Sequence, residues 1–188
     1  MRRRILNKLI SEEIKYNGPR FNIVQKIYER EDNVKYVRDC VEPGDAVVIL
    51  PVNNNNEIIF VKQYREVVGK DLLELPAGMI DKGENPKQAA IRELEEETGI
   101  KANNIEFLID FYASCGYTNE KVYVYIAKDF EKGKQHLDDT EEILSIEKIN
   151  IEDCIKDALE NKFEAAHVNI AILTYYLKNN KRRKKWKN

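Results

Sequence analysis

The segment from Asn85 to Gly99 carries both a start and a stop signal for a helix, and any fold of this chain must accommodate that helix. Asn85 is a favoured N-cap, and Pro86 suits the first helical position, where its missing N–H costs no hydrogen bond. Gly99 supplies the left-handed backbone with which many helices end. We therefore predict a helix over residues 86–98.

Stretches rich in β-branched and aromatic residues lie on both sides of this helix. They predict strands at Phe21–Tyr28, Tyr36–Val41, Ala46–Val52, Ile58–Tyr64, Phe107–Tyr112, Val122–Ala127 and Ile143–Ile149. The asparagine run 53–56 separates two of them and predicts a tight hairpin turn. Two more helices are expected, at 151–161 and 166–178. The pattern predicts an α+β fold in which sheet predominates.

The composition is that of one main domain with a packed core beneath a charged surface. The chain has 188 residues, of which 43% are hydrophobic and 34% charged. It has no apolar run of membrane-spanning length, and Glu12 and Glu13 interrupt the basic N-terminus before a signal-peptide core forms. Three cysteines without C-x-x-C spacing indicate reduced thiols. We therefore expect a cytoplasmic protein without a membrane partner.

The charge distribution argues against a nucleic-acid partner. The net charge is -2, but six of the 31 basic residues lie within residues 181–187, so the other 25 face 33 acidic residues. Proteins that coat phosphates present a broad basic face, whereas an acidic body suits a site that recruits a metal ion. We interpret residues 181–188 as a solvated basic tail, with binding to nucleic acid or to an anionic membrane as the alternative.

Three carboxylates share one face of the predicted helix. Glu93, Glu96 and Glu97 are spaced i, i+3 and i+4, and like charges at this spacing repel by roughly 0.2–0.5 kcal/mol per pair. An exposed charged face is the alternative interpretation of these three residues alone. Glu84, on the glycine-flanked loop before the helix, adds a fourth carboxylate, and Arg92 is placed to hold Glu84 or Glu96 in a bidentate grip. Oxygen ligands of this kind select Mg²⁺ or Mn²⁺ and favour a phosphate substrate.

Residues 78–100 match the signature of the Nudix hydrolases. Gly78, Glu84 and the run from Arg92 to Ile100 reproduce G-x5-E-x7-R-E-U-x-E-E-x-G-U at every specified position. Outside this box the chain resembles the ADP-ribose pyrophosphatase branch of the family. The segments that carry this second resemblance are Gln63–Arg65, Leu75–Gly78, Ser114 with Gly116, Glu120, and Glu141 with Glu142.

The resemblance implies a Nudix α/β/α sandwich with a mixed sheet, which uses Mg²⁺, or Mn²⁺, to hydrolyse a nucleoside diphosphate linked to another moiety. For ADP-ribose the products would be AMP and ribose 5-phosphate. The alternatives are hydrolysis of another nucleotide, such as a dinucleoside polyphosphate, NADH or a GDP-sugar, and a regulator that binds ADP-ribose without cleaving it. Cys115 stands where the branch commonly has proline, and losing a fixed φ makes that loop more adaptable.

The resemblance also assigns roles to individual residues. The metal ligands would be Glu93, Glu97 and the carbonyl of Ala77, with Glu96 acting directly or through water and Glu84 nearby. The catalytic groups would be Glu96, Arg92 as the residue that orients ligands, and Glu141 or Glu142 as general base on a loop after the box. Arg65 would contact substrate phosphate, and the pocket would be lined by Met79, Ser114, Gly116 and Glu120. Because clustered carboxylates raise one another's pKa, we expect an alkaline optimum.

The turn at residues 42–45 separates a polar N-terminal segment from the apolar strands. We expect residues 1–44 to form a small N-terminal β subdomain and residues 45–180 to form the hydrolase domain. Enzymes that this chain resembles are usually dimers that exchange N-terminal strands, which implies a homodimer. Arg38 would then contact the substrate bound to the other chain, or it is a surface arginine on an edge strand.

Overall fold

The computed structural model describes residues 7–137 and 142–185, the last five as backbone only. The strands are β1 (Lys8–Asn17), β2 (Asn22–Glu29), β3 (Lys35–Glu42), β4 (Ala46–Pro51), β5 (Glu57–Arg65), β6 (Lys70–Glu74), β7 (Ala77–Met79), β8 (Ile100–Tyr112), β9 (Lys121–Lys132) and β10 (Ile143–Asn150). The helices are α1 (Pro86–Thr98), α2 (Ile151–Leu159) and α3 (Ala166–Lys185). The chain divides into two compact units, one of residues 1–45 with 111–122 and one of residues 46–110 with 123–188.

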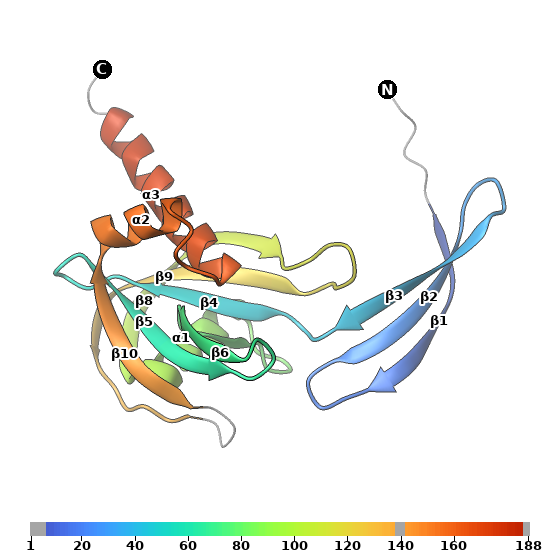
Figure 1. Cartoon of the computed structure of the whole chain (residues 1–188), viewed down its shortest axis with the longest axis horizontal. Coiled ribbons are helices and arrows are strands. Elements are labelled where there is room, and N and C mark those ends of the chain that lie inside the picture. The colour runs from blue at the N-terminus through green and yellow to red at the C-terminus, as the bar shows by residue number, and fades with distance from the viewer. Residues whose placement is uncertain (1–6, 138–141, 186–188) are drawn as a thin grey trace. The chain divides into compact units, whose positions relative to one another are not determined.

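The larger unit places sheet between helices (Figure 1). Its strands are ordered β10-β5-β6 in one sheet and β7-β4-β9-β8 in the other. Val47 and Ile49 of β4 pack against α1 in one buried cluster. Since side chains alternate along a strand, the buried Val48 and Leu50 point to the opposite face, and α3 contacts β4 there. The α+β class predicted from the sequence is confirmed.

Helix α1 begins and ends where its flanking residues predict. Asn85 accepts a hydrogen bond from the backbone N–H of Gln88, and the Gln88 side chain accepts one from the N–H of Asn85 in return. Gly99 adopts the left-handed conformation, at φ 66°, and its N–H donates to the carbonyl of Glu95. These caps hold the helix that carries the acidic residues in a fixed position along the chain.

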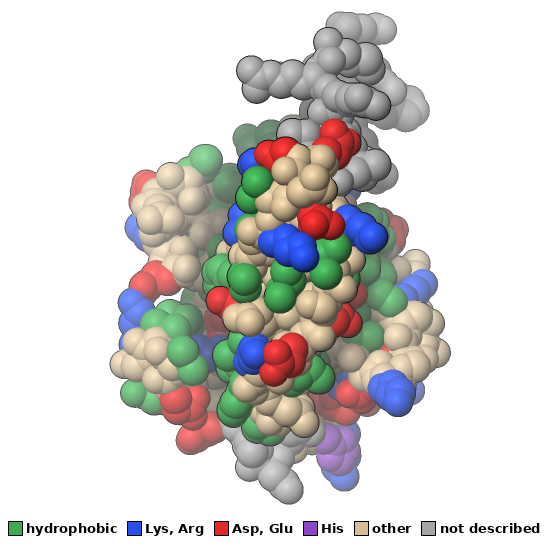
Figure 2. Space-filling model, turned by 90° about the vertical axis from the view of Figure 1, so that its right-hand side faces the viewer, with side chains coloured by type: hydrophobic (Ala, Val, Ile, Leu, Met, Phe, Trp, Pro, Cys, Tyr) green, Lys and Arg blue, Asp and Glu red, His purple; other side chains and the backbone are tan. Residues whose placement is uncertain are grey.

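The smaller unit contains an antiparallel sheet ordered β1-β2-β3. Strand β1 is exposed along its whole length, and its apolar side chains Leu9, Ile10, Ile14 and Tyr16 are 40–59% exposed. Figure 2 shows hydrophobic side chains exposed between acidic and basic ones. The described residues of this unit include no helix that could cover the sheet.

The predicted strands are present in the structure, with β8 and β9 longer than expected. The hairpin turn is also confirmed, because the Asn53 side chain accepts hydrogen bonds from the N–H groups of Asn55 and Glu57. The pattern missed β1, β6 and β7, and helix α3 extends seven residues beyond the predicted end at 178. None of the helices in the described parts of the chain is both long and apolar enough to cross a membrane. The three cysteines are unpaired.

Candidate active site

Arg92 is the centre of a carboxylate cluster, which we define as Glu84, Glu93, Glu96 and Glu97. Its Nε and Nη2 donate to the two oxygens of Glu84 at 3.1 and 2.9 Å, which is the bidentate geometry expected from the sequence. Its Nη1 donates to Glu93 at 2.7 Å and to Glu96 at 2.8 Å. The structure therefore brings three of the four acidic residues to one guanidinium.

Strand β7 supports the two buried carboxylates of the cluster. Glu97 is 2% exposed, and its Oε2 accepts a hydrogen bond from the backbone N–H of Ala77 at 3.0 Å. Glu93 is 7% exposed and lies against Gly78, where an added Cβ would come within 2.1 Å of the carboxylate carbon. A side chain at position 78 would thus occupy the space that Glu93 uses.

The charges in the cluster do not balance. Arg92 contacts three of the carboxylates, and the fourth, Glu97, accepts from a backbone N–H, so the cluster has four acids to one guanidinium. The hydrogen bond from Arg92 lowers the pKa of Glu84 and outweighs the opposite effect of partial burial. For Glu84, the expectation that clustered carboxylates raise one another's pKa is therefore wrong, because Arg92 lies between the acids.

The donor chemistry of the carboxylate cluster fits a hard divalent cation. Carboxylate oxygens with excess negative charge favour Mg²⁺ or Mn²⁺ over metals that prefer sulfur. Among the described residues, however, no three acidic, histidine or cysteine side chains already surround one point as metal ligands. Instead, Oε1 of Glu93 and Oε2 of Glu96 accept hydrogen bonds from Arg92, so the guanidinium engages one oxygen of each carboxylate.

Residues 133–137, which we call the capping segment, cover the C-terminal end of α1. The N–H of His136 donates to the carbonyl of Glu96 at 2.9 Å, and the Gln135 side chain donates to the carbonyl of Glu97 at 2.6 Å. The N–H of Gly133 donates to the carbonyl of Gly99 at 2.7 Å. These donors satisfy carbonyls that the end of a helix leaves without partners. The capping segment is thereby hydrogen-bonded to the helix that bears the carboxylate cluster.

The candidate general base Glu142 lies at the same end of the β5–β10 pair as Arg65. Ile143 pairs with Gln63, so Glu142, the residue before it, lies beside the last two residues of β5. The Glu142 side chain is exposed. Glu141, the other candidate, lies outside the described residues.

Arg65 does not extend freely from the end of β5. Its Nε donates to Oε2 of Glu74 at 2.7 Å, and the Glu74 side chain is only 6% exposed. Nε2 of His167, on α3, lies 3.9 Å from the other oxygen of Glu74 and is buried without a hydrogen-bond partner among the described residues. The sequence marks Glu74 only by the apolar neighbours Leu72, Leu73 and Leu75, among which a carboxylate is unexpected.

The other predicted substrate-binding residues, Arg38, Ser114, Gly116 and Glu120, belong to the smaller unit. Arg38 lies over the ring of Tyr36, 4.7 Å from its centroid, and donates to the carbonyl of Val37. The Ser114 carbonyl accepts hydrogen bonds from Tyr117 and Thr118 in a turn that leaves Gly116 exposed. Burial, with a smaller contribution from Asp45, raises the pKa of Glu120. Met79 belongs to the larger unit, where its carbonyl accepts from Arg92 and its side chain is exposed.

Comparison with known protein families shows which family this carboxylate cluster belongs to. The model of the NUDIX domain matches residues 42–169, which include the carboxylate cluster, Arg65 and the capping segment. The chain belongs to the Nudix family. Nudix enzymes typically use divalent metal ions, in agreement with the donor chemistry of the cluster.

Individual Nudix proteins resemble the chain over most of its length. The ADP-ribose pyrophosphatase of Bacillus subtilis is 33% identical over 151 residues, which cover 79% of this chain and 81% of that protein. The methanol dehydrogenase activator of Bacillus methanolicus is 33% identical over 136 residues, 72% of this chain and 74% of that protein. The crystal structure of an ADP compounds hydrolase superposes with a TM-score of 0.81 at 25% identity, over 93% of this chain and 95% of that one. The Nudix fold predicted from the box is thereby confirmed, and the chain is an ADP-ribose pyrophosphatase-like Nudix hydrolase.

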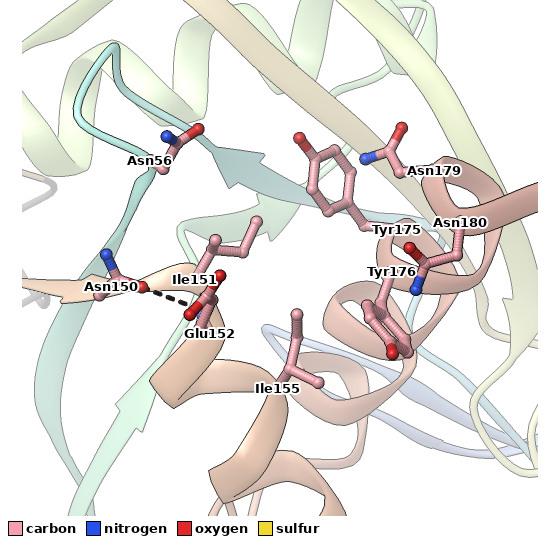
Figure 3. Close-up of a pocket in the computed structure, with 9 residues that line it drawn as sticks. All are labelled: Asn56, Asn150, Ile151, Glu152, Ile155, Tyr175, Tyr176, Asn179 and Asn180. Atoms are coloured by element: carbon pink, nitrogen blue, oxygen red, sulfur yellow. Dashed lines mark hydrogen bonds between the residues drawn. The ribbon is translucent and has the colours of Figure 1, made fainter. Parts of the chain in front are cut away.

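A pocket of about 640 Å³ lies outside the Nudix box, between the β4–β5 turn, α2 and α3 (Figure 3). Tyr175 and Tyr176 line it together with Ile151, Ile155, Glu152 and four asparagines, Asn56, Asn150, Asn179 and Asn180. The Asn150 side chain is already engaged, because it caps α2 by accepting from the N–H of Glu152. The predicted site residues do not line this pocket.

Proposed function

We propose that the chain hydrolyses the pyrophosphate bond of ADP-ribose, or of a related nucleoside diphosphate sugar, and that Mg²⁺ is its cofactor. ADP-ribose would yield AMP and ribose 5-phosphate. The observation that carries this proposal is the carboxylate cluster itself, held by Arg92 on α1 and backed by Ala77 and Gly78. The similarity to the B. subtilis ADP-ribose pyrophosphatase supports the choice of substrate.

In this proposal the metal ligands are Glu93, Glu97 and the carbonyl of Ala77, with Glu96 acting directly or through water and Glu84 nearby. A divalent cation, when bound there, supplies Lewis acidity to the pyrophosphate and lowers the pKa of bound water. Arg92 orients the ligands, because its hydrogen bonds with Glu84 fix the guanidinium that holds Glu93 and Glu96.

Arg65 and one of the two candidate glutamates act on the substrate. Arg65 binds a phosphate oxygen, and Glu142 or Glu141 takes the proton of the water that attacks phosphorus. The attack breaks one P–O bond of the bridge, and the electron pair of that bond leaves with the second phosphate. Support for this arrangement comes from the strand register, which places Glu142 next to the end of β5.

We also propose that the functional form is a homodimer whose chains exchange their N-terminal strands. The exposed apolar residues of β1 support this assembly, because a monomer would leave them in water. Arg38 would then reach the substrate of the other chain, with Met79, Ser114, Gly116 and Glu120 completing the pocket. Residues 1–44 would serve as the dimerisation element.

A hydrolysis screen tests the proposed function. The chain would be incubated with Mg²⁺ and ADP-ribose, ADP-glucose, GDP-mannose, NADH or diadenosine polyphosphates, and the products separated by chromatography. Release of AMP from ADP-ribose in preference to the others is the expected result. Glu97→Gln, which removes the charge of a proposed ligand, should abolish turnover and leave the circular dichroism spectrum unchanged.

The other outcomes of the screen are equally informative. Preference for another compound would contradict ADP-ribose as substrate while leaving the metal site in place. Binding of ADP-ribose without turnover of any compound would indicate a regulator. Substantial activity of Glu97→Gln would contradict the metal ligands assigned above.

A further inference from the structure

Glu74 is a buried acid that the proposed reaction does not use directly. Its side chain is 6% exposed, whereas that of Arg65, its partner, is 37% exposed. A carboxylate removed from water is costly unless a cation and hydrogen bonds compensate for it. Arg65 supplies that compensation, so the two groups determine each other's position.

The register of β5 and β6 shows how far Arg65 reaches toward this partner. Val61 pairs with Glu74, and Arg65 pairs with Lys70 near the turn. Since alternate residues share a face, Arg65 and Glu74 lie on the same side of the hairpin but at opposite ends of it. The Arg65 side chain therefore runs back along the strand to bring its Nε within 2.7 Å of Glu74.

This contact leaves part of the guanidinium available. Arginine presents five N–H donors in a planar fork, and the Glu74 contact uses the one on Nε. Within the described parts of the chain, the Nη groups of Arg65 have no protein acceptor. Glu74 precedes the proposed ligand Ala77 by three residues, a separation of at most about 10 Å along extended chain. Glu74, the partner of Arg65, thus lies close to the strand that backs the carboxylate cluster.

We propose that Glu74 is a positioning residue, which holds the guanidinium of Arg65 through Nε so that its Nη groups face the substrate phosphate. The inference rests on the proposed function, in which Arg65 is the phosphate contact. Without Glu74, the long side chain of Arg65 would sample many rotamers, and binding would have to overcome the lost entropy.

His167 completes the surroundings of Glu74 from the side of α3. Its Nε2 is 3.9 Å from Glu74, beyond hydrogen-bond distance. Burial lowers the pKa of His167, an effect that Glu74 opposes and Arg65 reinforces. The neutral imidazole therefore does not compete with Arg65 for the carboxylate near neutral pH.

A double-mutant cycle tests the proposal by steady-state hydrolysis of ADP-ribose in saturating Mg²⁺. Glu74→Gln should raise KM about tenfold and change kcat less than about threefold, because the contact binds ground state and transition state alike. In an Arg65→Ala background the same substitution should change kcat/KM less than about twofold. Equal losses in the two backgrounds, or an unchanged KM in Glu74→Gln, would overturn the proposal.

Two further variants separate positioning from folding. Glu164→Gln removes the ion pair of Glu164 with Lys70, which also joins β6 to the chain before α3, and it should leave KM unchanged. Arg65→Lys keeps the charge but lacks the fork, so it should raise KM as much as Arg65→Ala. If Arg65→Lys instead retained the original KM, a fork held by Glu74 would be unnecessary and the proposal would fail.

Proton NMR supplies a measurement that does not depend on turnover. The Nε–H signal of Arg65, assigned by its loss in Arg65→Ala, should exchange with water at least about tenfold faster in Glu74→Gln than in the unmodified chain. An unchanged exchange rate would overturn the proposal. Absence of ADP-ribose hydrolysis by the unmodified chain would contradict the proposed function instead, and the NMR result would still decide whether Glu74 holds Arg65.

Discussion

Arg92 shows how one residue organises several acids that would otherwise repel one another. Its contacts with Glu84, Glu93 and Glu96 leave the cluster with excess negative charge but with defined geometry. The acids of the helix were predictable because residue spacing determines which side chains share a helical face. The contact between Glu97 and the backbone of Ala77 was not predictable, because it depends on where β7 packs against α1.

Gly78→Ala provides a test of the space around Glu93. The added Cβ would come within 2.1–2.4 Å of the Glu93 carboxylate atoms, so the carboxylate must move. We expect hydrolysis to fall by about 10–100-fold, the range found when the support of a metal ligand is disturbed. Activity assays and circular dichroism would measure loss of function and retention of fold.

Lys87→Ala is the matched control for Gly78→Ala, because Lys87 lies on the exposed side of the same helix. It should retain full activity. Normal activity in Gly78→Ala would show that Glu93 has room to move without functional loss.

Glu84 predicts a specific dependence of stability on pH. Arg92 lowers the pKa of folded Glu84 below its ordinary value of 4.5, so the folded state binds this proton less tightly than the unfolded state. The resulting stabilisation is complete above the unfolded pKa and is lost as pH falls through the folded pKa. Thermal unfolding of the unmodified chain and of Glu84→Gln between pH 6 and pH 3 should show a Tm difference that shrinks below about pH 4.5. A difference that stays constant over this range would contradict the assignment.

At the scale of whole helices and strands, the sequence predicted the elements whose boundaries are set by adjacent residues. Helix α1 was predicted to the residue, because its caps are adjacent to it. Strands β6 and β7 were missed because five and three residues are too few for a periodic pattern. Strand β1 was missed because Ser11, Glu12 and Glu13 break its apolar alternation, and pairing with β2 alone makes it a strand.

The residues of the candidate site also fall into those that the sequence predicted and those that it missed. The residues of the Nudix box were found because they lie within 23 positions of sequence. Glu74 and Gln135 were missed because their contacts with Arg65 and Glu97, 9 and 38 residues away, form only through strand pairing and loop packing. A carboxylate within the apolar run 72–75 was the one local signal for Glu74.

The capping segment makes a prediction for the end of α1. Gln135→Ala removes the donor to the Glu97 carbonyl and should destabilise the fold by about 1 kcal/mol. For a chain of this size the Tm should fall by about 2–4 °C. The rate constant kcat should fall as well, because the capping segment, which precedes the proposed base Glu142 or Glu141 in sequence, is hydrogen-bonded to α1. Calorimetry would measure the change in stability, and steady-state kinetics would measure the change in kcat.

Lys134→Ala, at the exposed neighbouring residue, is the control and should change neither quantity. An unchanged kcat in Gln135→Ala would show that the capping segment contributes to stability alone.

At the scale of the whole molecule, the N-terminal sheet is the feature on which the proposed dimer depends. Ile14 is 59% exposed on β1 and belongs to an apolar row that the described residues of the smaller unit do not cover. Exposed apolar rows of this kind mark surfaces of association. The sequence alone predicted a polar N-terminal β segment. The structure shows that the apolar side chains of this segment are exposed on β1.

Ile14→Lys tests the proposed dimer. Light scattering coupled to size exclusion should give about twice the 22.0 kDa chain mass for the unmodified protein and a mass near one chain for the variant. Leu159→Lys places the same charge at a 70% exposed residue of α2, and it should remain dimeric. A monomeric unmodified protein would contradict the assembly.

The capping segment also restricts how the length of this chain can change. At the β4–β5 turn, Asn53 forms its side-chain hydrogen bonds within the turn, and only the last turn residue, Asn56, accepts a hydrogen bond from α2, from the N–H of Ile151, among the described residues. Between Gly133 and His136, one inserted residue would carry the donors past the carbonyls of α1 that they serve. Insertions should therefore be tolerated better at residues 53–55 than at residues 133–136.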